Sequence, residues 1–526
     1  MLRQIIKKPN LTQVKSLSSK LHSKASASTF SSLHQSSRLW YYGLGLTLTV
    51  AGVATLYNTI PKIQLDNETE DPIKLQALQV KHLRDTVKVY LWGDNTNLIV
   101  APNEVRIEFF KLPVSLSFFD NCALRDLKLG KTSAAAVDVN GDVYQWGLGY
   151  FGPNAEDYTP KKTLKGWNIV KVELTDDKII CLTQNGHLFL MPSDNSKLYT
   201  LPKKERFSTW LGQSTSPDKN YCIELKVPGL KWGENIVELE SGNHHIAIIT
   251  SNGRLLTLAT DPEGTQFGQL GVQSGEVYKF YEPEFLDKTL KFEKLAIGSN
   301  HTIVASSSHR LFGFGMNDLG QLGLGDFKQS TSIIREPVEL PNLNAQIESL
   351  HLGGDTSFIN AGNQILSFGN GQFGQLGNGQ FVHFKPNATQ VTQLSNKFYW
   401  DESKNEKVGL KFSQISAGNT HAFFVLDSLP GNGNAWGRSV YALGRNHCGQ
   451  LGNDKRSNAS SPITLPPILP ASIPASAQGS IHLQLPYSAK LNTRTPDTDK
   501  LYGKNVSGIM ESGFNNSAIY FRLDSV

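Results

Sequence analysis

The chain contains 526 residues, of which 39% are hydrophobic and 18% are charged, with 46 glycines, 24 prolines and four cysteines. This apolar fraction excludes a wholly disordered chain, and the glycines are too scattered for collagen. The net charge is +5, but residues 1–65 hold eight Lys or Arg and no acid, so residues 66–526 carry 43 bases against 46 acids, a net −3. Because phosphate-backbone binding draws on a basic excess, this balance disfavours nucleic acid as a partner.

Residues 1–38 are rich in Ser, Lys and Arg and contain no Asp or Glu. Their first eight residues can form a short basic amphipathic helix, which is typical of a mitochondrial targeting presequence. We therefore predict a presequence at residues 1–38. A basic tail without a targeting role is the alternative.

Residues 39–60 form a run of 22 residues without a charge. At about 1.5 Å per residue, such a helix covers the roughly 30 Å hydrocarbon layer of a bilayer. Trp40, Tyr41 and Tyr57 lie near its two ends, where aromatic side chains suit the membrane interfaces. We predict a single transmembrane helix at 39–60, with a buried helix of a soluble domain as the alternative, and a linker at 61–85.

The charges that flank this span indicate an orientation. Bases precede it, and Asp66, Glu68, Glu70 and Asp71 follow it closely. If the positive side stays in the matrix, the body faces the intermembrane space. The predicted location is thus the mitochondrial inner membrane, crossed once through residues 39–60.

A four-residue phrase, Gly-Gln-Leu-Gly, occurs at 268–271, 320–323, 374–377 and 449–452. An apolar/small strand such as Phe312-Gly-Phe-Gly315 precedes three of these copies. Counting weaker copies, the fourth residue of this strand falls at positions 93, 147, 192, 259, 315, 369 and 444. A repeat of about 50 residues with short strands and glycine turns predicts propeller blades rather than a helical solenoid.

A second phrase lies between these strands and runs apolar-x-apolar, a small residue, a polar turn and another apolar strand. It is clear at 239–248, 295–304 and 415–424, and looser copies begin at Leu127, Val172, Leu350 and Met510. This phrase therefore also occurs seven times.

The two ends of the repeat region complement each other. The first strand (Val87–Trp92) has no hairpin before it, and the last hairpin (Ile509–Phe521) has no strand after it. Joining them completes a blade and removes exposed sheet edges. The predicted fold is all-β: a seven-bladed β-propeller over 86–524, closed by N- and C-terminal strands, with a proline-rich insertion at about 454–500 and preceded by the presequence and transmembrane helix.

These motifs resemble the regulator of chromosome condensation family, whose members form seven-bladed propellers from such repeats. The resemblance covers about residues 86–524. The region 172–192 departs from it, because Thr175 and Pro192 stand where other repeats have glycine. A presequence and a membrane span ahead of the propeller resemble the fungal mitochondrial inner-membrane member of this family that is linked to assembly of respiratory complex III.

Three histidines, His245, His301 and His421, occupy equivalent turn positions. A propeller places them in different blades, so we interpret them as groups that each satisfy their own turn rather than as metal ligands. The adjacent His244 is expected to be exposed. The cysteines at 122, 181, 222 and 448 lack metal-like or disulfide spacing and are interpreted as small buried hydrophobic residues.

Sequence motifs for catalysis are missing: there is no phosphate-binding loop, dinucleotide fingerprint, nucleophile elbow or zinc motif. We therefore predict no enzyme and assign no catalytic, cofactor-binding or metal residues. Insertions at 193–232, 398–407, 429–437 and 454–500 carry aromatics or prolines. Such aromatics either dock a partner or pack a loop on its own blade, and both interpretations stay open.

The resemblance implies a scaffold or assembly factor whose protein partners are subunits or assembly factors of respiratory complex III, the cytochrome bc complex. One alternative is a guanine-nucleotide exchange factor for a mitochondrial small GTPase, since exchange is the activity of the family's nuclear member. Another is a mitochondrial ribosome- or RNA-associated propeller, against which the net −3 of the body counts.

Overall fold

The computed structural model describes residues 71–197, 222–285, 287–325, 331–341, 343, 345–401, 404–427, 437–473, 479 and 481–524. These residues belong to one compact unit, Glu68–Val526. The predicted presequence, the predicted transmembrane helix and the first ten residues of the predicted linker lie outside the described ranges. Within those ranges, no helix combines the length and the apolar character needed to cross a membrane.

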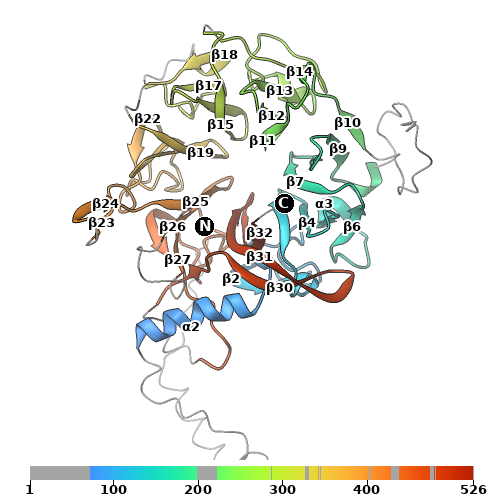
Figure 1. Ribbon diagram of the computed structural model, residues 1–526, viewed down its shortest axis with the longest axis vertical. Helices are drawn as coiled ribbons and strands as arrows, with labels where there is room; N and C mark the ends of the chain where they lie inside the picture. Colours follow the sequence, from blue (N-terminus) through green and yellow to red (C-terminus); the bar gives the residue numbers. More distant parts are fainter. Residues whose placement is uncertain are drawn as a thin grey trace, which may run out of the picture. The chain divides into compact units, whose positions relative to one another are not determined.

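Nearly half of the described residues lie in strands, which form largely antiparallel sheets arranged around a common centre (Figure 1). Each of four sheets contains four strands, which follow one another in chain order from the centre outward. These are β7 (Ile169–Leu174), β8 (Lys178–Thr183), β9 (Leu188–Pro192) and β10 (Ile223–Leu225); β11 (Ile236–Ser241), β12 (His245–Thr250), β13 (Leu255–Ala259) and β14 (Phe280–Tyr281); β15 (Phe292–Ile297), β16 (His301–Ser306), β17 (Leu311–Met316) and β18 (Ile333–Glu339); and β19 (Ile347–Gly353), β20 (Thr356–Ala361), β21 (Gln364–Asn370) and β22 (Phe384–Gln390).

Two further sheets are larger. One comprises β25 (Phe412–Ala417), β26 (His421–Leu426), β27 (Arg438–Gly444), β28 (Ala459–Thr464) and β29 (Gln484–Leu485). The other has nine strands: β1 (Tyr90–Asp94), β2 (Phe109–Ser115), β3 (Leu124–Leu129), β4 (Ala134–Asp138), β5 (Val143–Trp146), β6 (Lys161–Leu164), β30 (Ala489–Thr495), β31 (Thr498–Ser512) and β32 (Asn516–Leu523). Its run β31-β32-β1-β2 meets the run β3 to β6 at a parallel bridge between Leu124 and Arg522.

Short elements complete the described chain. The helices are α2 (Pro72–Asp85) and α3 (Leu148–Phe151), with 3-10 turns η2 (Ser117–Phe119), η3 (Asn195–Lys197) and η4 (Pro262–Thr265). A separate hairpin is formed by β23 (Phe398–Asp401) and β24 (Glu406–Gly409).

The second strand of each sheet is buried on both faces. In β16 every residue is buried; Ile303 and Ala305 pack in one hydrophobic cluster, and Val304 between them packs in the next. Because neighbouring sheets cover both faces of such a strand, its apolar residues occur consecutively instead of alternating with exposed polar ones. This packing explains the apolar runs that the repeat pattern detected.

The recurring glycine at the end of the third strand is required by backbone geometry. Gly315 has φ of +107°, a conformation that other residues rarely adopt. A Cβ on this residue would also collide with the carbonyl of Asn300. Gly444 has the same conformation, with φ of +103°.

The predicted joining of the chain ends is confirmed. Strand β1 pairs antiparallel with β32, from Tyr90 opposite Ile519 to Gly93 opposite Asn516. Trp92 is fully buried, and its indole Nε1 donates to the Gln450 carbonyl at 2.9 Å. The first strand therefore bonds both the last strand and the preceding sheet.

Two predicted segments contain regular structure that the sequence did not indicate. The linker expected at 61–85 ends in helix α2, whose N-cap Asp71 accepts from the Ile73 amide at 2.9 Å. Gln79, also on α2, exchanges hydrogen bonds with the Gln484 backbone at 2.8 and 3.1 Å. The insertion expected at 454–500 contains three strands, because β28 and β29 extend the sheet of β25–β27, and β30 pairs with β31.

Candidate functional site

The innermost strands bring a set of polar side chains to the centre of the ring. Four of the seven middle residues of the apolar-x-apolar phrases are charged, and all four line a central cavity: Lys128 on β3, Glu173 on β7, Glu240 on β11 and Glu511 on β31. The equivalent residues on β15, β19 and β25 are Ala296, His351 and Ser416. The charge is thus concentrated on one side of the centre.

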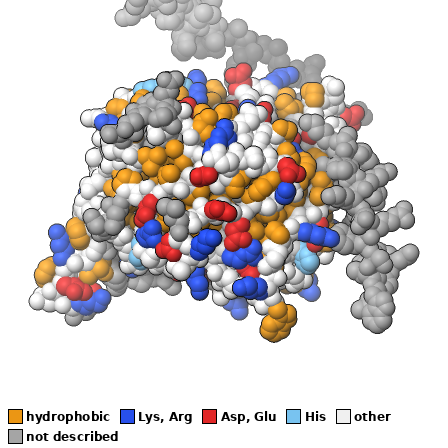
Figure 2. Space-filling view, turned by 90° about the horizontal axis from the view of Figure 1, so that it is seen from above, with side chains coloured by type: hydrophobic (Ala, Val, Ile, Leu, Met, Phe, Trp, Pro, Cys, Tyr) orange, Lys and Arg blue, Asp and Glu red, His pale blue; other side chains and the backbone are white. Residues whose placement is uncertain are grey.

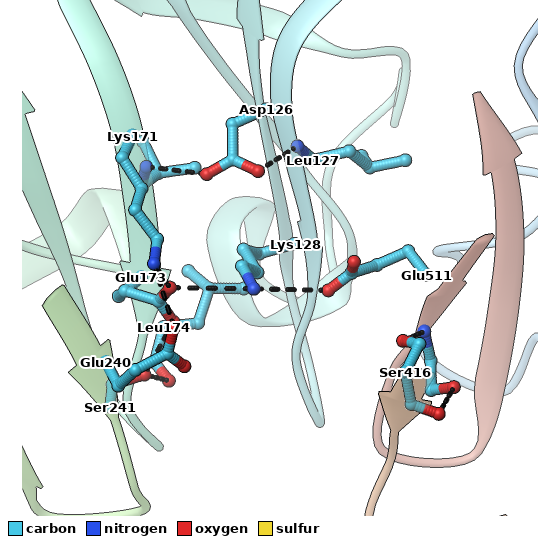
Figure 3. Close-up of polar contacts among 12 residues, drawn as sticks. Asp126, Leu127, Lys128, Lys171, Glu173, Leu174, Glu240, Ser241, Ser416 and Glu511 are labelled. Atoms are coloured by element: carbon cyan, nitrogen blue, oxygen red, sulfur yellow. Dashed lines mark hydrogen bonds and ion pairs between the residues drawn. The ribbon is translucent and has the colours of Figure 1, made fainter. Parts of the chain in front are cut away.

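Ion pairs link these side chains across neighbouring innermost strands (Figure 3). Lys128 Nζ lies 3.3 Å from Glu511 Oε1 and 3.5 Å from Glu173 Oε1. Lys171 Nζ lies 3.3 Å from the same Glu173 oxygen and 2.9 Å from Glu240 Oε1. The result is a continuous chain of alternating charges from β31 through β3 and β7 to β11, which we call the central ion-pair chain.

Asp126 fixes the backbone beneath this chain. Its two carboxylate oxygens accept from the Leu127 and Val172 amides, each at 3.0 Å (Figure 3). The Val172 bond joins β3 to β7 between two sheets. The carboxylate therefore holds Lys128 and Lys171 at a fixed separation.

The carboxyl groups of the centre outnumber its ammonium groups, and burial acts on their pKa values. Burial raises the pKa of Glu511 to about 7, although Lys128 opposes the shift. Burial, reinforced by the charge of Glu240, likewise raises the pKa of Glu238 to about 7. Lys128 has the opposite environment, because Glu173 and Glu511 hold its pKa well above the usual range despite its burial.

A cavity of about 180 Å³ opens above the central ion-pair chain. Its floor consists of Lys128, Glu173, Glu240 and Glu511, and its rim consists of the turns that follow the innermost strands, including Lys131 and Asp176. This lining favours cationic or hydrogen-bond-donating groups. Because the charges of the floor pair with one another, removing one partner would leave a buried charge uncompensated.

The three equivalent histidines do not serve their own turns, which corrects that interpretation. The Nε2 atom of each lies within hydrogen-bond distance of a hydroxyl on the next sheet. The pairs are His245 and Thr302 at 3.1 Å, His301 and Ser357 at 2.9 Å, and His421 and Ser517 at 2.8 Å. The imidazole is long enough to reach the second strand of the neighbouring sheet, where sheets crowd together near the centre.

The hydroxyl continues the contact to the Gly-Gln-Leu-Gly turn. Ser357 Oγ donates to the Gln321 carbonyl at 2.7 Å, and Ser517 Oγ donates to the Gln450 carbonyl at 2.9 Å. Each hydroxyl thus accepts from the imidazole, which places the imidazole proton on Nε2. Burial lowers the pKa of His301 to about 3, so this imidazole is neutral at physiological pH. We call this contact the histidine–hydroxyl link.

His244 differs from its predicted exposure. Its Nδ1 lies 2.9 Å from Asp261 Oδ2 and its Nε2 lies 3.1 Å from Glu263 Oε2, and the side chain is only 15% exposed. The hydrogen bond that His244 donates to Asp261 raises the pKa of His244. Among the described residues, no three His, Cys, Asp or Glu side chains are placed to hold a metal ion together.

The cysteines and insertions divide between buried and exposed positions. Cys122 and Cys181 are buried, as expected, whereas Cys222 and Cys448 are half-buried, and all four are free thiols. Trp232 is fully exposed at the end of the first insertion. Most of that insertion (198–221) and most of the loop 429–437 lie outside the described residues.

Sequence reasoning missed the central ion-pair chain. A signal was present, because four of the seven middle positions of the second phrase are charged. The pairing between different strands depends on which sheets are neighbours, which a single phrase does not contain.

Removing one histidine–hydroxyl link should destabilise the ring. Ser357→Ala leaves the buried His301 Nε2 proton and the Gln321 carbonyl without their partner. We expect a loss of about 1–3 kcal/mol in the free energy of unfolding, measured by chemical denaturation of the full chain. Ser307→Ala, on the exposed turn after β16, is the matched control. Equal stability of both variants would refute a structural role for the link.

Stability should also depend on the ionisation of Glu511. The pKa of Glu511 is about 7 in the folded protein against an ordinary value of 4.5. The contribution of protonated Glu511 to the free energy of unfolding is therefore complete below pH 4.5 and is lost as the pH rises through 7. Glu511→Gln cannot ionise, and we expect its stability relative to the wild type to increase by about 1–3 kcal/mol between pH 4.5 and pH 8. Melting temperatures across this pH range measure the difference. The exposed Glu293→Gln is the control, and a Glu511→Gln difference independent of pH would contradict the assignment.

Comparisons with known proteins agree with this geometry. A family model described as regulator of chromosome condensation (RCC1) repeat matches residues 308–359 and 363–425, and a second model of the same description matches 292–321. The chain is 22% identical over 479 residues to "Protein FMP25, mitochondrial" of Saccharomyces cerevisiae, covering 83% of this chain and 72% of that protein. It is 26% identical over 352 residues to the ultraviolet-B receptor UVR8 of Arabidopsis thaliana, covering 65% and 69%.

Solved structures show the same fold. Human WBSCR16 aligns with a TM-score of 0.57 at 14% identity, over 83% of this chain and 100% of that chain. Prp20p of Saccharomyces cerevisiae aligns with a TM-score of 0.55 at 17% identity, over 84% of this chain and 92% of that chain. The chain thus contains regulator of chromosome condensation repeats between residues 292 and 425, and its described part has the fold of solved propellers.

Proposed function

We propose that this protein is a membrane-anchored mitochondrial propeller that acts as a non-catalytic scaffold or assembly factor. The acid-free presequence at 1–38 and the uncharged span at 39–60 support the location. Similarity to a yeast protein named as mitochondrial supports it independently. The body then lies at the inner membrane, facing the intermembrane space.

The propeller of this proposal has seven blades. The nine-stranded sheet counts as two blades, β31-β32-β1-β2 and β3 to β6, because the parallel bridge between Leu124 and Arg522 is the contact that merges them. The other five blades are the sheets that begin with β7, β11, β15, β19 and β25. In this count the chain ends share one blade, which makes the body a rigid closed platform.

The observation that carries a binding role is the hairpin β23–β24. Phe398 and Trp400 are two residues apart on β23, so they share one face, and they are 43% and 60% exposed. The hairpin forms its own two-stranded sheet, and Lys407 Nζ lies 4.1 Å from the centre of the Phe398 ring. These aromatics therefore present a surface instead of packing into a blade, and exposed aromatics commonly serve as interface anchors.

The proposed clients are subunits or assembly factors of respiratory complex III, as the family resemblance implies. A span ahead of the propeller would confine the search for these clients to the membrane in which the cytochrome bc complex is built. A rigid platform with a projecting aromatic hairpin suits the capture of an assembly intermediate.

Affinity capture tests this proposal. Tagged full-length protein from gently solubilised mitochondria should recover complex III subunits or assembly factors in stoichiometric amounts, identified by mass spectrometry. Phe398→Ser/Trp400→Ser should reduce that recovery at least about tenfold, because truncating hot-spot aromatics costs 1.4 kcal/mol or more. Melting temperature checks that the variant is folded.

Val105→Ser/Ile107→Ser is the matched control, since it removes two other exposed apolar side chains. Its recovery of partners should equal that of the wild type. Recovery of a small GTPase whose binding weakens when nucleotide is added would replace the scaffold proposal with nucleotide exchange. A salt-sensitive association with RNA would replace it with a ribosome-associated role.

A further inference from the structure

One rim of the body combines exposed bases with exposed apolar side chains. It is formed by helix α2 and the hairpin β30–β31, which lie side by side at the bottom of Figure 1 and are in contact. We call it the α2–hairpin surface and define it by Lys74, Lys81, Lys490, Lys500, Leu501, Tyr502 and Lys504, all of them exposed.

Helix α2 is held rigidly with its bases outward. Leu75, Val80 and Leu83 are buried against the body, and Gln79 is bonded to the Gln484 backbone. The opposite face carries Lys74 and Lys81. The helix is therefore a fixed part of the rim.

The hairpin is anchored near its turn and exposed along one edge. Thr493 Oγ1 accepts from the Ala123 amide at 2.6 Å, and Arg494 Nε donates to the Asp120 carbonyl at 2.9 Å. By contrast, the eight residues 498–505 are all exposed, because β32 pairs with β31 only from Val506 onward. The hairpin thus offers a firm but uncovered strip.

The composition of this strip is apolar and basic. Leu501 is 54% exposed and Tyr502 is 41% exposed, and lysines precede and follow them at 500 and 504. Lys490 is on the paired strand β30, and its side chain lies over Gly503 of β31. A Cβ added to Gly503 would come within 3.0 Å of Lys490 Cε. Side chains alternate along β31, so Tyr502 lies with Lys500 and Lys504 on one face, and Leu501 lies with Lys490 on the other. Each face therefore combines the apolar and basic groups that bind a bilayer surface.

Two acids beside the strip are paired with bases, and a third, Asp524, accepts from the hydroxyls of Ser488 and Ser507. Asp499 pairs with Arg494 at 3.3 Å, and Asp497 pairs with Lys162 of β6. The charge that remains on the strip is therefore positive, although residues 66–526 carry a net −3. The rim opposite to α2, seen from above in Figure 2, shows bases and acids intermingled, with neither sign dominant.

We propose that the α2–hairpin surface rests on an anionic lipid bilayer, so that the propeller stands on its rim against the membrane. This inference builds on the anchor of the proposed function. Eleven residues separate the proposed span, ending at 60, from α2, beginning at 72. Even fully extended they reach only about 40 Å, so α2 stays near the membrane. Lipid charges are felt within about 8 Å at physiological salt, so the lysines contribute once the rim touches the surface.

Hydrogen–deuterium exchange of the full-length protein in lipid nanodiscs tests this arrangement. Amides of residues 498–505 should exchange about tenfold more slowly in discs containing phosphatidylglycerol than in discs of phosphatidylcholine alone. The hairpin β23–β24, also exposed and aromatic, is the internal reference and should not change. Equal exchange of 498–505 in both lipids would overturn the proposal.

Charge reversal supplies the matched variants. Lys490→Glu/Lys500→Glu/Lys504→Glu should abolish the lipid-dependent protection, whereas Lys231→Glu/Lys288→Glu/Lys411→Glu, an equal charge change at exposed positions elsewhere, should retain it. Loss in both variants would mean that overall charge, not this surface, governs the effect, and would overturn the proposal. Leu501→Ser/Tyr502→Ser should weaken the protection without any change of charge.

The proposed membrane anchor and the proposed lipid-binding role of the α2–hairpin surface can be refuted separately. If the protein does not enter discs, the anchor is wrong, and flotation with phosphatidylglycerol vesicles then tests the surface alone. Flotation that the Lys490, Lys500 and Lys504 reversals abolish would support the surface without the anchor. No flotation in that case would overturn both.

Discussion

The pairing of β1 with β32 is the constraint on which the rest of the body depends. Sheets that pack face to face around a centre leave two exposed faces unless the first and last sheets meet. Here the first strand of the region lies beside the last one, and Trp92 and Ser517 donate to the same Gln450 carbonyl of the preceding sheet. The chain ends are thereby tied to each other and to a neighbour, which closes the ring.

The closing strands repeat the contacts of the other sheets. Ser517 of β32 accepts from His421 as Ser357 of β20 accepts from His301, so the joint between the chain ends uses the same histidine–hydroxyl link. Glu511 of β31 also provides the end of the central ion-pair chain through Lys128. Closure and central electrostatics are therefore coupled: a displaced β31 would leave the buried Lys128 without one of its two carboxylate partners, a costly change at a buried site.

The repeat pattern predicted the fold well because it records the burial of each strand. All seven strands identified by their fourth residue occur, and the degenerate region 172–192 still forms a four-stranded sheet with β10. Helix α2 escaped prediction because Gln76 and Gln79 interrupt its apolar stripe, and both are buried through hydrogen bonds to residues about 400 positions away. The strand β30 escaped for a similar reason, since its polar sequence is stabilised by pairing with β31.

The elements that repeat in every sheet and the elements added to the repeat have different roles in this propeller. The Gly-Gln-Leu-Gly turns, histidines and marker glycines all maintain contacts between neighbouring sheets, so none of them is free to select a partner. Selection must come from elements added to the repeat: the hairpin β23–β24, helix α2 and the hairpin β30–β31. The first presents aromatics with both signs of charge nearby, and the other two present lysines around a leucine and a tyrosine. These surfaces differ in chemistry and come from separate segments of the chain, so one can hold a protein client while the other holds the membrane.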